Sequence, residues 1–145
     1  MEWHRGDLTI STDPALMDLE TVHGWLSGTY WATSVPYEVV ERSVRGSLAF
    51  GVYRGATQVG VARVITDRAT FAYLSDVFIA ESERGKKTGE WLIETIMAHP
   101  ELQGLRRWLL STRDAHGLYA KFGFVPLKSA ERLMERHDPA IYTKR

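Results

Sequence analysis

The stretch from Thr70 to Ile79 constrains the fold most, because its length and its β-branched and aromatic side chains are typical of a central strand. A helix carrying Leu92, Ile93 and Ile96 follows, and residues 107–111 then form a second buried apolar run. Two strands of one sheet that are joined through a crossover helix lie parallel. The sequence therefore predicts an α/β fold whose sheet contains a parallel pair.

Apolar spacing and turn residues place the other elements around this unit. Two amphipathic helices are expected first, and a β-hairpin follows them. A short helix that Asp114 would cap and Gly123 would end comes after the second buried run, and two edge strands would complete the chain. The expected ranges are 13–27 and 34–46 for the helices, 47–65 for the hairpin, 114–122 for the short helix and 124–142 for the edge strands. This order predicts a mixed sheet with helices on both faces.

The length and the charge balance exclude several classes of protein. The 145 residues fit one domain, residues 1–145. Because 18 basic residues balance 18 acidic ones, a nucleic-acid or membrane partner is not expected. The absence of cysteine excludes disulfides, thiolate metal sites and a cysteine acyl-enzyme. The start of the chain has no apolar stretch of signal-peptide length, so a cytoplasmic location is expected.

A basic, glycine-containing loop lies between the long strand and its helix, from Arg84 to Gly89. Loop amides and the free N–H groups of a helix's first turn converge there, which is an arrangement suited to binding an anion. A solvated, charged turn remains an equal alternative on this pattern alone. A Walker A loop is excluded because Lys86 stands where its second glycine is needed, and the dinucleotide fingerprint is absent.

Two segments together resemble the GNAT superfamily of N-acyltransferases. The segment Asp76-Val77-Phe78-Ile79, followed after four residues by Arg84-Gly85-Lys86-Lys87-Thr88-Gly89, resembles motif A. The segment from Thr112 to Phe124, which includes Ala115, Tyr119 and Gly123-Phe124, resembles motif B. Two departures stand out: Lys87 replaces the first glycine of motif A, and Thr112 replaces an asparagine common in motif B. A lysine at a position of positive φ could cost roughly 1 to 2 kcal/mol and weaken coenzyme A binding.

The resemblance implies a GNAT fold, a mostly antiparallel sheet with a splayed parallel pair, and acetyl-CoA as the co-substrate without a metal. It implies that the pantetheine arm lies along the backbone of Val77, Phe78 and Ile79. The amide of Phe78 or Ile79 would then stabilise the thioester oxyanion. The implied acetyl-CoA-binding positions are Val77, Phe78, Ile79, Arg84, Gly85, Lys86, Lys87, Thr88, Gly89, Thr112 and Tyr119.

The same resemblance implies that Tyr119 protonates the departing thiolate, although packing against Leu118 and Phe122 is an alternative role for this ring. A general base is needed because an alkylamine is mostly protonated at neutral pH. Asp76 is the first candidate for this base, His116 is the second, and water or the substrate alone is the third. The remaining histidines show no spacing typical of a metal site, so none is expected.

The acceptor site is expected near the first two helices, where Tyr30, Trp31 and Tyr37 could line a pocket and Glu38 or Glu41 could attract an amine. Three functions remain open: an N-acetyltransferase acting on a primary amine of a small molecule or protein, a non-catalytic GNAT-fold domain that binds coenzyme A or a related ligand, and a phosphate-binding regulatory domain of another α/β type. A homodimer is left open as the oligomeric state.

Overall fold

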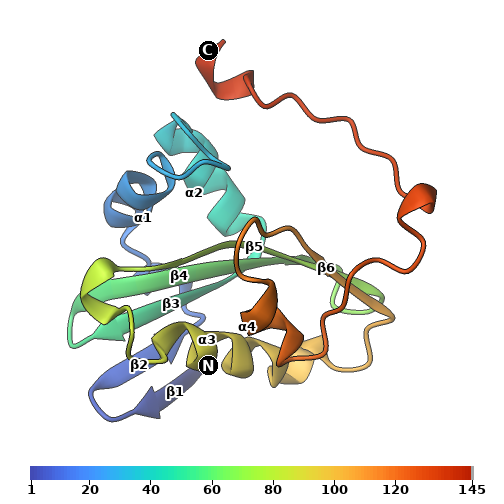
Figure 1. The fold of residues 1–145 in the computed structure, drawn as a ribbon. Helices are drawn as coiled ribbons and strands as arrows, with labels where there is room; N and C mark the ends of the chain where they lie inside the picture. The colour runs from blue at the N-terminus through green and yellow to red at the C-terminus, as the bar shows by residue number, and fades with distance from the viewer. Residues whose placement is uncertain (145) are drawn as a thin grey trace.

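The computed structural model describes residues 1–144, which build one six-stranded sheet with its strands in chain order (Figure 1). The strands are β1 (Glu2–Arg5), β2 (Leu8–Ser11), β3 (Leu48–Arg54), β4 (Thr57–Thr66), β5 (Phe71–Ile79) and β6 (Arg107–Leu110). Neighbours from β1 to β5 pair antiparallel, whereas β5 and β6 are parallel. The predicted mixed sheet with a parallel pair is confirmed.

Helices cover both faces of this sheet, as the sequence predicted (Figure 1). On one face, α1 (Leu19–Leu26) and α2 (Tyr37–Arg45) pack in a cluster of buried side chains that includes Val22, Val40 and Val61. On the other face, α3 (Thr88–Met97) and α4 (His116–Ala120) contribute to the larger cluster around the fully buried Phe50. The crossover from β5 to β6 runs through α3, which explains the parallel pairing.

The first helix is shorter than predicted. Asp13 caps only a 3₁₀ turn, Pro14–Leu16, and the α-helix begins five residues later. Asp18 sets this start, because its side chain accepts a hydrogen bond from the Thr21 N–H, while its own N–H donates to Gln58 Oε1 on β4 at 2.7 Å. A contact across 40 residues therefore breaks the helical pattern.

A β-hairpin at the N-terminus, β1 with β2, was not predicted. Its turn lies at Gly6-Asp7, where Gly6 adopts a φ of +60°. The hairpin extends the antiparallel sheet beyond β3, and Ile10 is fully buried in the larger cluster.

The two edge strands predicted in residues 124–142 do not form. Residues 125–144, which we call the C-terminal arm, contain two 3₁₀ turns, Ala130–Arg132 and Ile141–Thr143. The arm leaves the body after α4 and follows a wide arc back toward α1 and α2 (Figure 1). Its backbone has no neighbouring strand within the described part of the chain, so apolar composition alone did not produce a strand here.

None of the helices within residues 1–144 is both long and apolar enough to cross a membrane.

Candidate active site

The strands β5 and β6 separate at one end of the sheet. Their pairing runs from Phe71 opposite Arg107 to Leu74 opposite Leu110, whereas β5 continues to Ile79. A bulge begins at this point: Asp76 and Val77 together stand opposite a single residue of β4. Asp76 itself adopts a φ of +54°. Because a bulge bends its strand and increases the local twist, β5 turns away from β6 and a gap opens between them.

The backbone of β5 beyond the bulge faces this gap at alternate residues. The Ala80 N–H donates to the Val59 carbonyl at 2.8 Å, so Ala80 and Phe78 direct their backbone groups toward β4. The backbone N–H and C=O groups of Ile79 point away from β4, toward the gap. Arg84 Nε donates to the Ile79 carbonyl at 3.0 Å. The Ile79 N–H is therefore the amide in this segment best placed to meet a ligand in the gap.

The side chain of Phe78 is half-buried and packs against the smaller cluster, stacking on Trp25 with ring centroids 5.2 Å apart. The Arg84 guanidinium lies 5.3 Å from the centre of the same ring. Val77 and Ile79 are half-buried and pack against the larger cluster.

The loop from Arg84 to Gly89, apart from Lys86, lines a cavity of about 310 Å³ at the start of α3. The helical hydrogen bonds of α3 begin with the one from the Trp91 N–H to the Lys87 carbonyl, so the N–H groups of Thr88, Gly89 and Glu90 precede the helical ladder. Thr88 is 3% exposed, and its hydroxyl has no hydrogen-bond partner in the described structure. Converging amides, an unpartnered buried hydroxyl and neighbouring cations fit a pyrophosphate group.

Lys87 occupies the left-handed region at the N-cap of α3, with φ +63° and ψ +19°. This is the position where motif A usually has its first glycine, and the positive φ explains that usage. Lys87 therefore has the positive φ on which the predicted strain depends.

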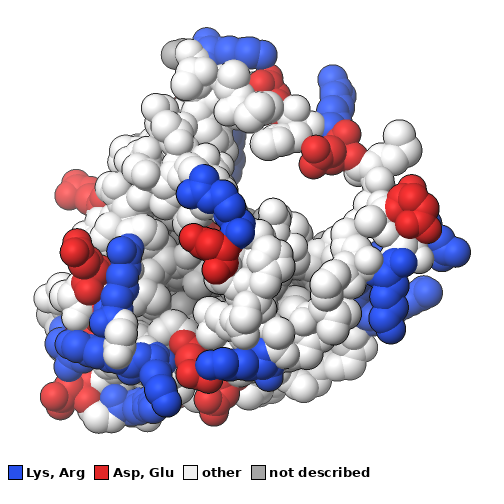
Figure 2. Space-filling view, in the orientation of Figure 1, with Lys and Arg blue, Asp and Glu red and all other residues white. Residues whose placement is uncertain are grey.

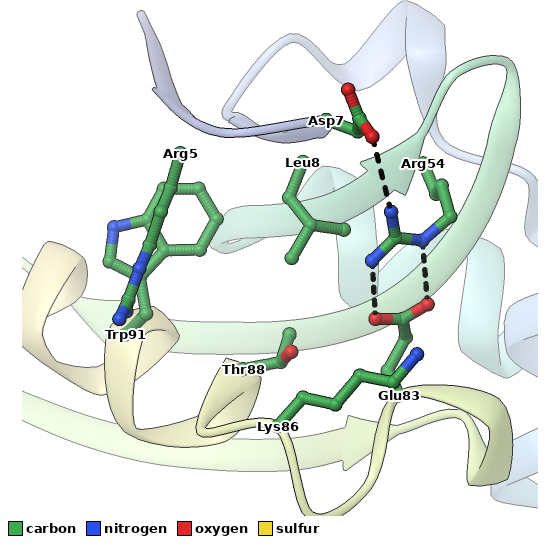
Figure 3. Close-up of a pocket in the computed structure, with 8 residues that line it drawn as sticks. All are labelled: Arg5, Asp7, Leu8, Arg54, Glu83, Lys86, Thr88 and Trp91. Carbon is green, nitrogen blue, oxygen red and sulfur yellow. Dashed lines mark hydrogen bonds and ion pairs between the residues drawn. The ribbon is translucent and has the colours of Figure 1, made fainter.

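An ion pair that the sequence did not predict holds the segment just before the loop (Figure 3). Arg54 at the end of β3 donates from Nε and Nη2 to the two carboxylate oxygens of Glu83, at 2.8 and 2.9 Å. The Glu83 side chain is 3% exposed, and the hydrogen bonds from Arg54 lower the pKa of its carboxyl. The pair borders a second cavity of about 170 Å³ that Lys86 and Thr88 also line. The partners lie 29 residues apart, so no local pattern could have revealed them.

Tyr119 lies on α4 with only 8% of its surface exposed. Burial raises the pKa of its phenol, with a smaller contribution from Tyr30, so the hydroxyl stays protonated at neutral pH and can donate. The neighbouring Leu118 lines the loop cavity, which places α4 beside the loop.

The prediction that Asp114 caps α4 is wrong. The cap residue is Ala115, and its N–H donates to Thr112 Oγ1 at 3.0 Å. Thr112 thus supplies a side-chain acceptor at the start of α4, as an asparagine could. Gly123 has a φ of +90° just after the helix, as predicted.

Asp76 is held by two donors. Arg63 Nε lies 2.7 Å from one carboxylate oxygen, and Trp31 Nε1 lies 2.8 Å from the other. Trp31 contacts Tyr30 edge to face, and the Arg113 guanidinium lies 3.9 Å from the centre of the Tyr30 ring. The α1–α2 connection, the bulge of β5 and the segment before α4 therefore meet at the gap.

Two other predicted residues lie apart from this meeting point. Tyr37 begins α2 and contacts His23 edge to face, at 5.7 Å between ring centroids. His116 is the exposed first residue of α4. Across residues 1–144, no group of three or more histidine, aspartate or glutamate side chains is arranged to hold a metal ion.

Comparison with known proteins identifies the family. The profile of the acetyltransferase (GNAT) domain matches residues 45–126, which is more than half of the chain. A predicted acetyltransferase of Gibberella zeae is 36% identical over 142 residues, covering 82% of this chain and 79% of that protein.

Solved structures agree with this assignment. A predicted GNAT-family acetyltransferase from Xanthomonas campestris pv. campestris is 46% identical, with a TM-score of 0.93 over 97% of this chain and 99% of that chain. At that coverage the superposition includes most of the C-terminal arm. Glucosamine-6-phosphate N-acetyltransferase from Arabidopsis thaliana shares the fold alone, at 17% identity and a TM-score of 0.64 over 90% of this chain and 97% of that one. These matches exclude a regulatory domain of another α/β type, and the chain belongs to the GNAT family of acetyltransferases.

Proposed function

We propose that this protein is an N-acetyltransferase that transfers the acetyl group of acetyl-CoA to a primary amine by direct attack in a ternary complex. The observation that carries the proposal is the gap between β5 and β6, which has an outward-facing Ile79 amide, the anion-binding loop at one end and the protonated Tyr119 on α4. A thioester held in this gap would meet a hydrogen-bond donor on its carbonyl and an acid near its sulfur.

Each residue has a defined task in this proposal. The amides of Thr88 and Gly89, together with Lys86 and Lys87, hold the pyrophosphate, and β5 holds the pantetheine arm. As the amine nitrogen forms its bond to the acetyl carbon, the Ile79 N–H stabilises the negative charge on the carbonyl oxygen. The carbon–sulfur bond then breaks, and Tyr119 donates its proton to the leaving thiolate.

Asp76 is the proposed base that receives the proton of the attacking amine, directly or through water. A carboxylate has about four lone-pair sites, and the hydrogen bonds from Arg63 and Trp31 use two of them. Two sites remain to accept a proton. Tyr30 and Trp31, both largely exposed, form the proposed acceptor platform at the mouth of the gap.

Replacing Tyr119 with phenylalanine tests the acid. Tyr119→Phe removes only the hydroxyl, so we expect kcat to fall at least tenfold while the KM for acetyl-CoA stays nearly constant. Steady-state release of free thiol across a panel of polyamines, amino acids, aminoglycosides and peptides would measure both constants. Tyr73→Phe, in the closed part of the β5–β6 pair, is the matched control and should behave as wild type. Unchanged turnover in Tyr119→Phe would remove the assigned role.

A second candidate is a GNAT domain that binds coenzyme A or a related ligand without turnover. The strained Lys87 and the donors already bound to Asp76 favour it. Calorimetry with acetyl-CoA, combined with the amine panel, separates the two: saturable binding with no thiol release for any amine would support the binding protein. No saturable binding up to millimolar acetyl-CoA would contradict both.

A further inference from the structure

Arg113 is an exposed arginine at the mouth of the gap, in the segment between β6 and α4. Its guanidinium lies 3.9 Å from the centre of the Tyr30 ring, and its side chain forms no hydrogen bond or ion pair within residues 1–144. A guanidinium stacked on a ring keeps its N–H donors in its own plane, where carboxylate or phosphate oxygens can accept from them. Arg113 therefore has donors to offer a ligand.

Tyr30 holds this guanidinium on the side of the gap where the proposed acceptor lies. Tyr30 contacts Trp31 edge to face, with ring centroids 5.1 Å apart, and Trp31 donates from Nε1 to Asp76 at 2.8 Å. Tyr30 also contributes to the raised pKa of Tyr119, so its phenol lies near the proposed acid. Two aromatic rings thus separate the guanidinium of Arg113 from the proposed base, and one small molecule can reach both.

The charges on this side of the gap leave one positive charge in excess. Arg63 and Asp76 form an ion pair at 2.7 Å and neutralise each other. The adjacent Asp114 is exposed and forms no ion pair with Arg113. Figure 2 shows basic and acidic side chains interspersed over the viewed face, and the chain as a whole has no net formal charge. The charge of Arg113 thus acts locally rather than through a field of the whole molecule.

We propose that Arg113 selects the acceptor, and that the acceptor is a small primary amine with an anionic group, a carboxylate or a phosphate, at its other end. Asp76 receives the amine, Arg113 binds the anion, and the connecting atoms lie against Tyr30 and Trp31. A second ammonium group, as in a polyamine, meets Arg113 with like charge. This inference names the acceptor class of the proposed acetyl transfer and rests on that proposal for the role of the amine.

A set of acceptors of nearly equal length tests the preference. ε-Aminocaproate, ε-aminocaproamide and hexamethylenediamine share a primary amine and differ in the charge at the far end. We expect kcat/KM, measured by thiol release, to be at least about tenfold higher for ε-aminocaproate than for the amide and lowest for the diamine, because hydrogen bonds between charged groups are stronger than neutral ones. Phosphoethanolamine compared with γ-aminobutyrate shows whether a phosphate or a carboxylate is preferred.

Variants of Arg113 test the residue itself. Arg113→Gln should raise the KM for ε-aminocaproate at least about tenfold and leave the KM for acetyl-CoA and the kcat/KM for ε-aminocaproamide near their wild-type values. Arg113→Lys keeps the charge but not the planar fork, so it should restore part of the preference. Arg106→Gln is the matched control, because Arg106 is also exposed and lies at the closed end of the β5–β6 pair. It should behave as wild type.

Two-dimensional NMR in the presence of coenzyme A measures acceptor binding without turnover. ε-Aminocaproate should shift the indole N–H signal of Trp31, with a Kd at least about tenfold lower in wild type than in Arg113→Gln. Thiol release that is equal for the acid and the amide, or a variant that changes the KM for acetyl-CoA instead, would overturn the role of Arg113 and leave the acetyl transfer standing. Arg113-dependent binding without thiol release from any amine would contradict the acetyl transfer and leave the anion site standing. The absence of both binding and turnover would overturn both.

Discussion

Lys87 carries the backbone of the proposed anion-binding loop through a conformation that side chains resist. Its φ of +63° costs a lysine roughly 1 kcal/mol or more relative to glycine, because Cβ crowds the following carbonyl. The protein retains a cation beside the proposed pyrophosphate position in return. The strain of Lys87 therefore disfavours this conformation of the loop, whereas its positive charge favours an anion beside it.

Lys87→Gly separates these two effects. We expect it to raise the stability of the folded chain by about 0.5 to 1.5 kcal/mol, after allowing for the extra freedom of glycine in the unfolded chain. It should also tighten acetyl-CoA binding, because the loop would reach its bound form without strain. Urea unfolding and calorimetry measure the two quantities.

Arg68→Gly provides the matched control, since Arg68 has a φ of +61° in the β4–β5 turn, far along the chain from the loop. The Arg68→Gly variant should also be more stable than the wild type, but its affinity for acetyl-CoA should stay the same. Equal or weaker acetyl-CoA binding in Lys87→Gly would show that the charge of this lysine outweighs its strain.

Asp76 can be tested through the pH dependence of the reaction. In Asp76→Asn the base is lost, so kcat at pH 7 should fall about 10- to 100-fold. The deficit should shrink as the pH approaches 10, because the amine then loses its proton to water before it attacks. A profile of kcat against pH from 6 to 10, measured for the wild type and for Asp76→Asn, would test the role of Asp76 as base. A deficit that is constant across this range would assign Asp76 a positioning role through Trp31 and Arg63.

At the scale of elements, the Arg54–Glu83 pair fixes the 3₁₀ turn Glu81–Glu83 to the end of β3 (Figure 3). The pKa of Glu83 is lowered in the folded protein, so the unfolded chain binds a proton more readily. The stability from this pair is therefore present above the ordinary carboxyl pKa of 4.5 and is lost as the pH falls below it.

Arg54→Gln should lower the melting temperature at pH 7 by several degrees and raise the KM for acetyl-CoA several-fold, because Glu83 would lose its partner and the loop its anchor. Scanning calorimetry from pH 3 to 7 should show a smaller loss of stability on acidification than in wild type. Arg45→Gln, which breaks the exposed pair with Glu41 on α2, should change neither value. A melting temperature equal to wild type in Arg54→Gln would rule out the anchor.

Residues close in sequence explain which parts of the site could be predicted. Motif A placed the bulged strand, the loop and α3, since a strand, a basic loop and a helix follow one another without interruption. The contacts of Asp76 with Trp31 and of Arg54 with Glu83 span 45 and 29 residues, and no local pattern encodes them. The role of Thr112 as acceptor for α4 was equally hidden, because the nearby Asp114 offered a more familiar cap.

At the scale of the whole molecule, the predicted sheet order was correct from β3 to β6, and the errors lie at the two ends of the chain. The hairpin of β1 and β2 is four residues per strand, too short for a clear alternation, although the Gly6-Asp7 turn was a usable signal. The strands predicted for the arm do not form, because in the described part of the chain its backbone pairs with neither edge of the sheet.

The chain-order sheet also determines when the site comes into existence. Each pair of neighbouring strands from β1 to β5 is antiparallel. The β5–β6 pair is the only parallel pair in the described sheet, and α3 connects its two strands. Local hairpins form before distant pairings, because closing a long loop costs more entropy. The proposed gap for acetyl-CoA has β6 as a wall, so a chain in which only the local meander β3–β4–β5 has assembled has no place for its proposed substrate.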